Sequence, residues 1–202
     1  MGLLYLAAYL RERFPLEIQV VHQEIEKLTI DALARRIVDF DADIAALSCM
    51  TPAEHVLSQL TESLRAAKPE MLIILGGPHI SAVRETALKR TCADIAVPGE
   101  GEIALEQILA RHLEGGGLSD IPGIIHRNIE NEIVINQGIT PIVEDLDTLP
   151  FPAYDLIDVK QYWNRPSMVH VPQRQYITSD FLIPAGFFDL YSESCLALFC
   201  ID

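Results

Sequence analysis

Basic residues are scarce in this 202-residue sequence: 15 lysines and arginines stand against 29 aspartates and glutamates, which gives a net charge of −14 at pH 7. Proteins that bind nucleic acids neutralise phosphates with clustered lysine and arginine side chains. Docking on an anionic membrane surface needs basic clusters as well. The charge balance therefore predicts a protein with neither a nucleic-acid partner nor a membrane partner.

The sequence also has few cysteines and no long apolar run. No run approaches the ~18 residues that span a bilayer. The apolar stretch at residues 2–10 has no basic region before it and no cleavage site, and Arg11 follows at once. It is therefore interpreted as a buried helix rather than as a signal peptide. Four cysteines without a secretory signal indicate free thiols in a reducing compartment, so we expect a cytoplasmic protein.

What the sequence does contain is a series of short apolar runs, at residues 43–49, 71–77 and 94–97, each followed by a helical pattern. Runs that are apolar on both faces are typical of strands buried in a parallel sheet. Residues 17–21 form a weaker candidate strand before them. This alternation predicts the α/β fold class, with a doubly wound, mostly parallel sheet of the flavodoxin-like or Rossmann-like type.

Two threonines have the positions of helix caps. Thr29 precedes an amphipathic pattern, and Thr51-Pro-Ala-Glu54 has the form of a capping box with proline at the first helical position. We expect helices to begin at both places. A further helix is expected after Gly99-Glu-Gly-Glu102.

Three regions follow from the change of pattern along the chain. Residues 1–114 are predicted to form the α/β domain. Residues 115–158 read as a glycine-rich linker, a β-hairpin with strands at 123–127 and 132–136, and a proline-rich connector laid over the domain. Residues 159–202 are expected to be an irregular tail that packs poorly.

The expected sheet has one strand too few. A doubly wound domain of this kind normally begins with a strand, whereas this sequence begins at a helix. The missing strand would lie between the strands at 17–21 and 43–49. We therefore expect these two strands either to pair directly or to leave a gap that destabilises the fold.

Three loops lie where ligands bind in open α/β sheets, outside the carboxyl ends of the strands. They are Ser48-Cys-Met-Thr51, Gly76-Gly-Pro-His-Ile-Ser81 and Gly99-Glu-Gly-Glu102. Neither of the glycine-rich phosphate-binding motifs is present in the sequence, and the two glutamates of the third loop would repel a phosphate. A large ligand rich in amide groups fits better, because carboxylates and backbone carbonyls accept amide hydrogens.

These loops, with the helix at residues 2–10 and the Leu149-Pro-Phe-Pro152-x-Tyr154 motif, occur in an order and spacing that resembles the cobalamin-binding N-terminal region of radical S-adenosylmethionine proteins. The resemblance covers residues 2 to about 179. It implies cobalamin as the cofactor, with its nucleotide tail inserted beside the loops. The cofactor-binding residues that it implies are Ser48, Met50, Thr51, Gly76, Gly77, Pro78, His79, Gly99, Glu100 and Gly101.

His79 and the acidic pair have alternative interpretations. His79 could contact the cofactor or be a helix-entry histidine with solvated nitrogens. Glu100 and Glu102 could bind a ligand or stabilise the start of the next helix through its dipole. No metal ligand is predicted, since the histidines have no metal-ligand spacing and the family's cobalt-binding histidine motif does not occur in the sequence.

The second domain of the family opens with Cys-x-x-x-Cys-x-x-Cys, whose thiolates hold a four-iron cluster. After Ser179 the sequence has only Cys195 and Cys200, so the resemblance predicts no cluster here, and its abrupt end suggests a shifted reading frame or a truncated gene product. The resemblance thus implies that residues 159–202 are the remnant of the junction to a missing radical S-adenosylmethionine domain. We therefore expect a truncated cobalamin-binding module without catalytic activity of its own. The alternatives are a methyltransferase or cyclase fragment that acts only with a separate radical S-adenosylmethionine domain on a cluster-bearing partner chain, and a flavodoxin-like domain with another ligand or none.

Overall fold

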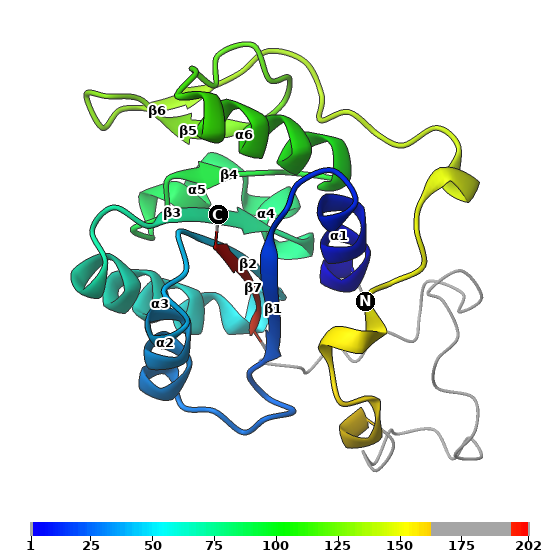
Figure 1. The fold of residues 1–202 in the computed structure, drawn as a ribbon. Helices are drawn as coiled ribbons and strands as arrows, with labels where there is room; N and C mark the ends of the chain where they lie inside the picture. Colours follow the sequence, from blue (N-terminus) through cyan, green and yellow to red (C-terminus); the bar gives the residue numbers. More distant parts are fainter. Residues whose placement is uncertain (1, 163–194, 202) are drawn as a thin grey trace.

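The computed structural model describes residues 2–162 and 195–201. Its centre is one seven-stranded sheet, which lies between two groups of helices (Figure 1). The strands are β1 (Glu17–His22), β2 (Ile44–Cys49), β3 (Leu72–Gly76), β4 (Ile95–Ala96), β5 (Ile125–Arg127), β6 (Ile133–Ile135) and β7 (Cys195–Ile201). Their order across the sheet is β1-β7-β2-β3-β4-β5-β6.

Helices cover both faces of the sheet, as the doubly wound fold requires. The α-helices are α1 (Gly2–Arg11), α2 (Ile30–Asp39), α3 (Glu54–Ala67), α4 (Pro78–Val83), α5 (Glu85–Lys89) and α6 (Glu102–Glu114). One buried apolar cluster joins α2, α3, α4 and α5 to the sheet, and a second joins α1 and α6 to the opposite face. The predicted α/β class with a mostly parallel sheet is confirmed.

Strand β2 shows why the predicted strands are apolar on both faces. Ala45 and Leu47 belong to the cluster beneath α2 and α3, whereas Ile44 and Ala46 belong to the cluster beneath α1 and α6. Successive side chains of a strand point to opposite faces, so a strand with helices on both sides needs apolar residues at every position. The strands predicted around residues 17–21, 43–49, 71–77 and 94–97 all form, although β4 is limited to two residues.

The gap expected between β1 and β2 is not present, and these strands do not pair with each other. Strand β7 lies between them and pairs with both in antiparallel register, with Val20↔Leu198 on one side and Ala46↔Leu198 on the other. Because β1 and β2 are both antiparallel to β7, they run parallel to each other, and β2, β3 and β4 also pair in parallel. The prediction of an irregular tail is therefore wrong for residues 195–201; most of the remaining tail lies outside the described residues.

One of the two predicted helix caps forms. The Thr29 hydroxyl oxygen accepts a hydrogen bond from Ala32 N–H at 3.2 Å. The capping box at Thr51 is wrong: a 3₁₀ turn, η1 (Thr51–Ala53), precedes α3, and its start has no side-chain cap. The two side chains of the expected box are engaged elsewhere, since Thr51 Oγ1 lies 3.3 Å from His79 Nδ1 and Glu54 accepts a hydrogen bond from an arginine of the α5–β4 loop.

The predicted hairpin and the connector both lie against the sheet domain. Strands β5 and β6 pair in antiparallel register, and β5 extends the sheet beside β4. The connector contains two short 3₁₀ turns, η2 (Leu146–Thr148) and η3 (Tyr154–Leu156), and a third, η4 (Val159–Tyr162), directly follows it. It returns to α1, where Ala153 N–H donates to the Leu4 carbonyl at 3.0 Å. The division at residues 114 and 158 stays a prediction. In residues 2–162 and 195–201, no helix has both the length and the apolar character needed to cross a bilayer.

Candidate functional site

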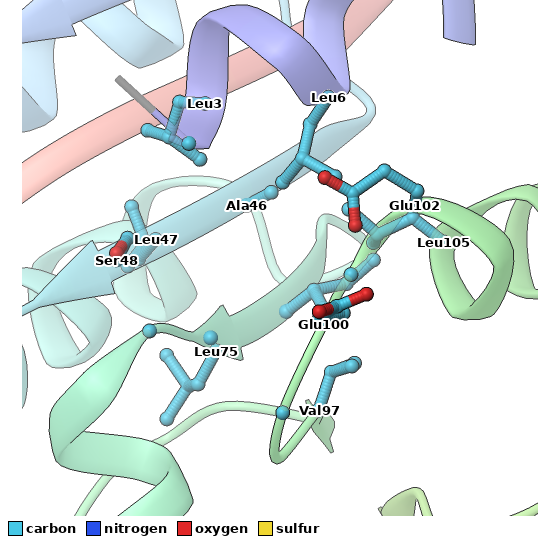
Figure 2. Close-up of a pocket in the computed structure, with 16 residues that line it drawn as sticks. Leu3, Leu6, Ala46, Leu47, Ser48, Leu75, Val97, Glu100, Glu102 and Leu105 are labelled. Atoms are coloured by element: carbon cyan, nitrogen blue, oxygen red, sulfur yellow. The ribbon is translucent and has the colours of Figure 1, made fainter. Parts of the chain in front are cut away.

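A cavity of about 200 Å³ opens at the carboxyl ends of β2 and β3, where the α1 helix and the loop before α6 meet (Figure 2). Its walls are mostly apolar. An apolar cavity of ~150 Å³ is enough to hold a benzene ring, so this volume suits a small planar aromatic group. The lining residues are Gly2, Leu3, Leu6, Ala46, Leu47, Ser48, Ile74, Leu75, Gly76, Gly77, Val97, Gly99, Glu100, Gly101, Glu102 and Leu105.

Three of these lining residues carry polar side chains. Figure 2 shows the Ser48 hydroxyl at the end of β2, and the carboxylates of Glu100 and Glu102 on the side where α6 begins. The remaining side chains around the cavity are aliphatic. The site can therefore hold an apolar ring while it offers hydroxyl and carboxylate oxygens to hydrogen-bond donors.

Two glycines allow the loops to approach each other closely at this edge. Gly77 has φ +93°, and a β-carbon there would lie 2.4 Å from Ser48 Oγ. At Gly101 a β-carbon would lie 3.2 Å from the nearest side-chain carbon of Leu6 on α1. Glycine is thus required at position 77 by both its backbone conformation and the contact with β2.

Gly76 differs from these two glycines. Its φ is not positive, and a β-carbon there would have one neighbour within 4 Å, the Val97 carbonyl oxygen at 4.0 Å. Gly76 nevertheless lines the cavity. The fold itself therefore tolerates a larger residue at this position, and the absence of a side chain leaves room at the cavity wall.

Hydrogen bonds join the loop at residues 76–81 to the loop at residues 99–102. The Ser81 hydroxyl accepts from Gly99 N–H at 2.9 Å and donates to the Gly77 carbonyl at 3.1 Å. From the connector, the buried Thr140 hydroxyl donates to the Pro98 carbonyl. The loop at residues 97–102 is thus fixed by both the α4 segment and the connector, which keeps its glycines and glutamates in place before any ligand arrives.

The carboxyl group of Glu102 has an altered acidity. Burial raises the pKa of Glu102 above its ordinary value, and the charge of the neighbouring Glu100 raises it further. Hydrogen bonds from the backbone of Glu102 itself and of Gly101 act in the opposite direction and lower the pKa. Desolvation at the cavity wall is the largest of these effects.

The structure brings six of the ten residues predicted for the cofactor site to this cavity: Ser48, Gly76, Gly77, Gly99, Glu100 and Gly101. Met50, Thr51, Pro78 and His79 do not line it. His79 is 1% exposed, so the alternative of a solvated histidine is wrong. Its Nδ1 lies near Thr51, and its Nε2 has no hydrogen-bond partner among the residues that the structure describes. A binding role for the ten residues stays a prediction.

Sequence reasoning did not assign α1 to the site. Gly2, Leu3 and Leu6 form one wall of the cavity, and Glu102 and Leu105 of α6 form another. The apolar face of α1 was interpreted as core packing, which most of it is, because Leu4, Ala7 and Ala8 are buried beneath it. Only the position of α1 over the carboxyl ends of β2 and β3 shows that its first turn also faces a cavity.

No group of three histidine, cysteine or acidic side chains in residues 2–162 and 195–201 is arranged to hold a metal ion. Cys49 is buried in the core. Burial, followed by the charge of Glu54, raises the pKa of its thiol to about 12. Cys49 is thus a poor thiolate ligand.

Two curated relatives match most of this chain. An uncharacterized methyltransferase of Pyrococcus horikoshii is 28% identical over 163 residues, which are 80% of this chain and 35% of the relative. The anaerobic magnesium-protoporphyrin IX monomethyl ester cyclase of Rubrivivax gelatinosus is 25% identical over 162 residues, which are 78% of this chain and 29% of the relative. The chain thus spans about a third of the length of these relatives.

Solved structures share the fold. The radical S-adenosylmethionine methyltransferase TsrM from Kitasatospora setae, with cobalamin and a 4Fe-4S cluster bound, superposes with a TM-score of 0.59 and 14% identity, covering 75% of this chain and 28% of TsrM. The cobalamin-dependent S-adenosylmethionine radical enzyme OxsB, with aqua-cobalamin and S-adenosylmethionine bound, gives a TM-score of 0.52 and 20% identity, covering 63% of this chain and 18% of OxsB. At these identities the likeness concerns the fold.

The family comparison bears directly on the cavity. The B12 binding domain family matches residues 1–109, which are more than half of the chain. All sixteen residues that line the cavity fall within this range. The chain belongs to the B12-binding domain family.

Proposed function

We propose that this chain binds cobalamin at the carboxyl ends of β2 and β3, with the aromatic base of the nucleotide tail in the 200 Å³ cavity. The observation that carries the proposal is the location of the whole cavity lining inside the matched B12-binding segment, residues 1–109. Ligands of open α/β sheets bind at this edge, which supports the same placement.

The chemistry of the cavity fits the two kinds of surface that cobalamin presents. The aliphatic walls from α1, β2 and β3 suit the flat apolar base. The corrin ring carries amide side chains, and the carboxylates of Glu100 and Glu102 can accept hydrogen bonds from such N–H groups. Gly76 and Gly77 allow a ligand to approach the backbone.

The contribution that we propose for this chain is binding and orientation. Bound cobalamin would supply the cobalt chemistry, and the residues around the cavity would hold the cofactor. The relatives named a methyltransferase and a cyclase are about three times as long as the matched segment. We propose that the chain has no such activity alone. The alternative is that it is a fragment of such an enzyme and acts only with a radical S-adenosylmethionine domain on a separate, cluster-bearing chain.

Titration of the protein with hydroxocobalamin tests the binding proposal. We expect a shift of the visible bands of the cofactor and its co-elution with the protein on gel filtration. The Gly76→Ala variant is expected to weaken binding about tenfold, because a methyl group at the cavity wall costs about 1–2 kcal/mol of ligand packing. Gly117→Ala is the matched control, since a β-carbon at Gly117 has no neighbour within 4 Å and Gly117 is not among the residues lining the cavity.

The outcomes separate the alternatives. Unchanged bands and no co-elution would reject cobalamin binding and favour a flavodoxin-like domain with another ligand or none. Binding that Gly76→Ala and Gly117→Ala affect equally would place the cofactor elsewhere. Iron analysis after anaerobic reconstitution addresses catalysis, and we expect no stoichiometric cluster; a bound cluster would contradict the proposal that the chain is inactive alone.

A further inference from the structure

The polar and the apolar side chains of the cavity lie at different depths. Glu100 is exposed, and Ser48 and Glu102 are half-buried. Every lining side chain that is buried is aliphatic, as in Leu3 of α1 and Leu75 of β3. The part of a ligand that enters the cavity therefore meets hydrocarbon, whereas the part that stays at the rim meets hydroxyl and carboxylate oxygens.

Backbone groups around the cavity are already engaged by the fold. The Val97 N–H donates to the Leu75 carbonyl at 2.8 Å. The Gly77 carbonyl and the Gly99 N–H are both hydrogen-bonded to the Ser81 hydroxyl. A polar ligand atom inside the cavity would have to compete with these bonds for a partner.

Leu6 lies where the apolar interior meets the polar rim. It is half-buried on α1. A β-carbon at Gly101 would lie 3.2 and 3.3 Å from the two terminal carbons of Leu6 and 3.7 Å from one of Leu105, so both leucines pack over this glycine. Figure 2 shows them beside Glu102. The Leu6 side chain thus presents hydrocarbon next to the Glu102 carboxylate.

Cobamides, the group of cofactors that includes cobalamin, differ in the base that ends the nucleotide tail. The base of cobalamin, dimethylbenzimidazole, carries methyl groups and has a single free ring nitrogen when it is not bound to cobalt. Adenine, the base of another cobamide, carries an amino group and several free ring nitrogens. Burial of methyl groups in an apolar site is favourable, whereas burial of polar groups without partners costs free energy.

We propose that the cavity selects among cobamides by their base, that it prefers dimethylbenzimidazole to adenine, and that Leu6 is a residue that determines this preference. The selection rests on the function proposed above, because the base must occupy the cavity to be distinguished. Adenine there would leave its amino group and ring nitrogens against aliphatic side chains and an engaged backbone. Dimethylbenzimidazole places its methyl groups against the same surfaces.

Equilibrium dialysis of the full chain against methylcobalamin and against its adeninyl counterpart tests the preference. A base held in the cavity is not bound to cobalt, so each dissociation constant includes the cost of detaching the base. Acid titration of each free cofactor, followed by its visible spectrum, measures that cost. After this correction we expect methylcobalamin to bind at least about tenfold more tightly, because a buried polar group without a partner costs at least this much affinity.

Variants of Leu6 isolate the cavity, since the cost of detachment belongs to the cofactor and cancels when variants are compared. Leu6→Gln offers an amide that can donate to a ring nitrogen and accept from the amino group of adenine, and should reduce the preference about fivefold or more. Leu6→Met keeps the wall apolar and should keep the preference, even where it changes both affinities. Leu113→Gln is the matched control, because Leu113 of α6 is 43% exposed and is not among the residues lining the cavity.

The outcomes separate this selection from the binding of cobalamin itself. Equal or tighter binding of the adeninyl cofactor after correction would overturn the selection and leave cobalamin binding intact. A preference that Leu6→Gln leaves as unchanged as Leu113→Gln does would overturn the role of Leu6. Binding of neither cofactor would reject the proposed function and the selection with it. Should Leu6→Gln fail to fold, Val97→Thr takes its place, since it puts a hydroxyl on a buried wall with little change in volume.

Discussion

Gly77 packs against Ser48 so closely that a β-carbon at position 77 would lie 2.4 Å from the Ser48 hydroxyl oxygen. Ser48 lies near the end of β2, Gly77 directly follows the neighbouring parallel strand β3, and both residues line the cavity. Their contact brings the backbone at the end of β3 against β2, so the cavity wall at this point is made by glycine backbone and one small hydroxyl.

The first prediction concerns this contact. In Gly77→Ala, the residue would have to keep a φ of +93°, which residues with a β-carbon rarely adopt, and its β-carbon would overlap with Ser48. The substitution should therefore lower the free energy of unfolding by about 1–3 kcal/mol. Urea denaturation measures the loss. Adding Ser48→Ala should recover part of it, because the closest atom is removed while the backbone strain stays. Gly76→Ala serves as the control with a neutral effect, and equal stability of both alanine variants would contradict this explanation.

The second prediction concerns Glu102. Its pKa is raised in the folded protein, so above pH 4.5 the folded state holds the proton more tightly than the unfolded state. The contribution of this group to stability is therefore fully present at lower pH and is lost as the pH rises through the folded pKa. Glu102→Gln removes the titration, so its stability relative to wild type should increase as the pH rises above the ordinary glutamate pKa of 4.5, and should level off once Glu102 is ionised in the folded state. Parallel urea curves at each pH measure the difference, and a constant difference between pH 4 and pH 7 would show that burial does not perturb Glu102.

The third prediction concerns the connector. Thr140→Val removes the hydroxyl that donates to the Pro98 carbonyl while it keeps the side-chain volume. Loss of this buried hydrogen bond should cost about 1–2 kcal/mol of stability and weaken cobalamin binding, because the loop at 97–102 is held less firmly. Thr140→Ser keeps the hydroxyl and is the control. Unchanged affinity in Thr140→Val would mean that the connector does not support the site.

The fourth prediction separates stability from binding. Arg65 donates to Asp94 Oδ2 at 2.6 Å and to the Met71 carbonyl at 3.0 Å, at the amino ends of β3 and β4, opposite the cavity. Arg65→Met should cost about 1.5–3 kcal/mol in urea denaturation, because hydrogen bonds to charged groups are lost, with cobalamin affinity unchanged. The stability of Arg65→Lys should lie between those of the wild type and Arg65→Met, since lysine keeps the charge but lacks the planar guanidinium group. A large fall in the cobalamin affinity of Arg65→Met, measured where the variant is fully folded, would contradict the location of the site.

Much of the fold follows from local patterns. The strand around Ile73, and the strand around Ala45 apart from Ser48, carry no polar side chain, which predicts burial on both faces. The turn between Asn128 and Asn131 predicts the hairpin. The capping box at Thr51 could not be judged locally, because His79, distant in sequence, lies beside the threonine hydroxyl. Strand β7 was missed for the same kind of reason: its partners β1 and β2 lie far away in the sequence.

The site was predictable in part. The small residues at and just after the carboxyl ends of β2 and β3, such as Ser48 and Gly77, mark the ligand edge of a parallel sheet. The contribution of α1 could not be read in this way, since the apolar pattern of Leu3 and Leu6 is the same for a cavity wall as for a core. Only the packing of α1 over the strand ends distinguishes the two.

The central claim is that cobalamin occupies the edge where β2, β3 and the loop before α6 meet. Amide hydrogen exchange with and without hydroxocobalamin tests it most directly, because it locates the protected backbone. We predict slower exchange at residues 46–50, 75–81 and 97–102, with the hairpin at 125–135 unchanged. Protection confined to the hairpin, or no protection at cofactor concentrations that saturate the visible spectrum, would contradict the claim.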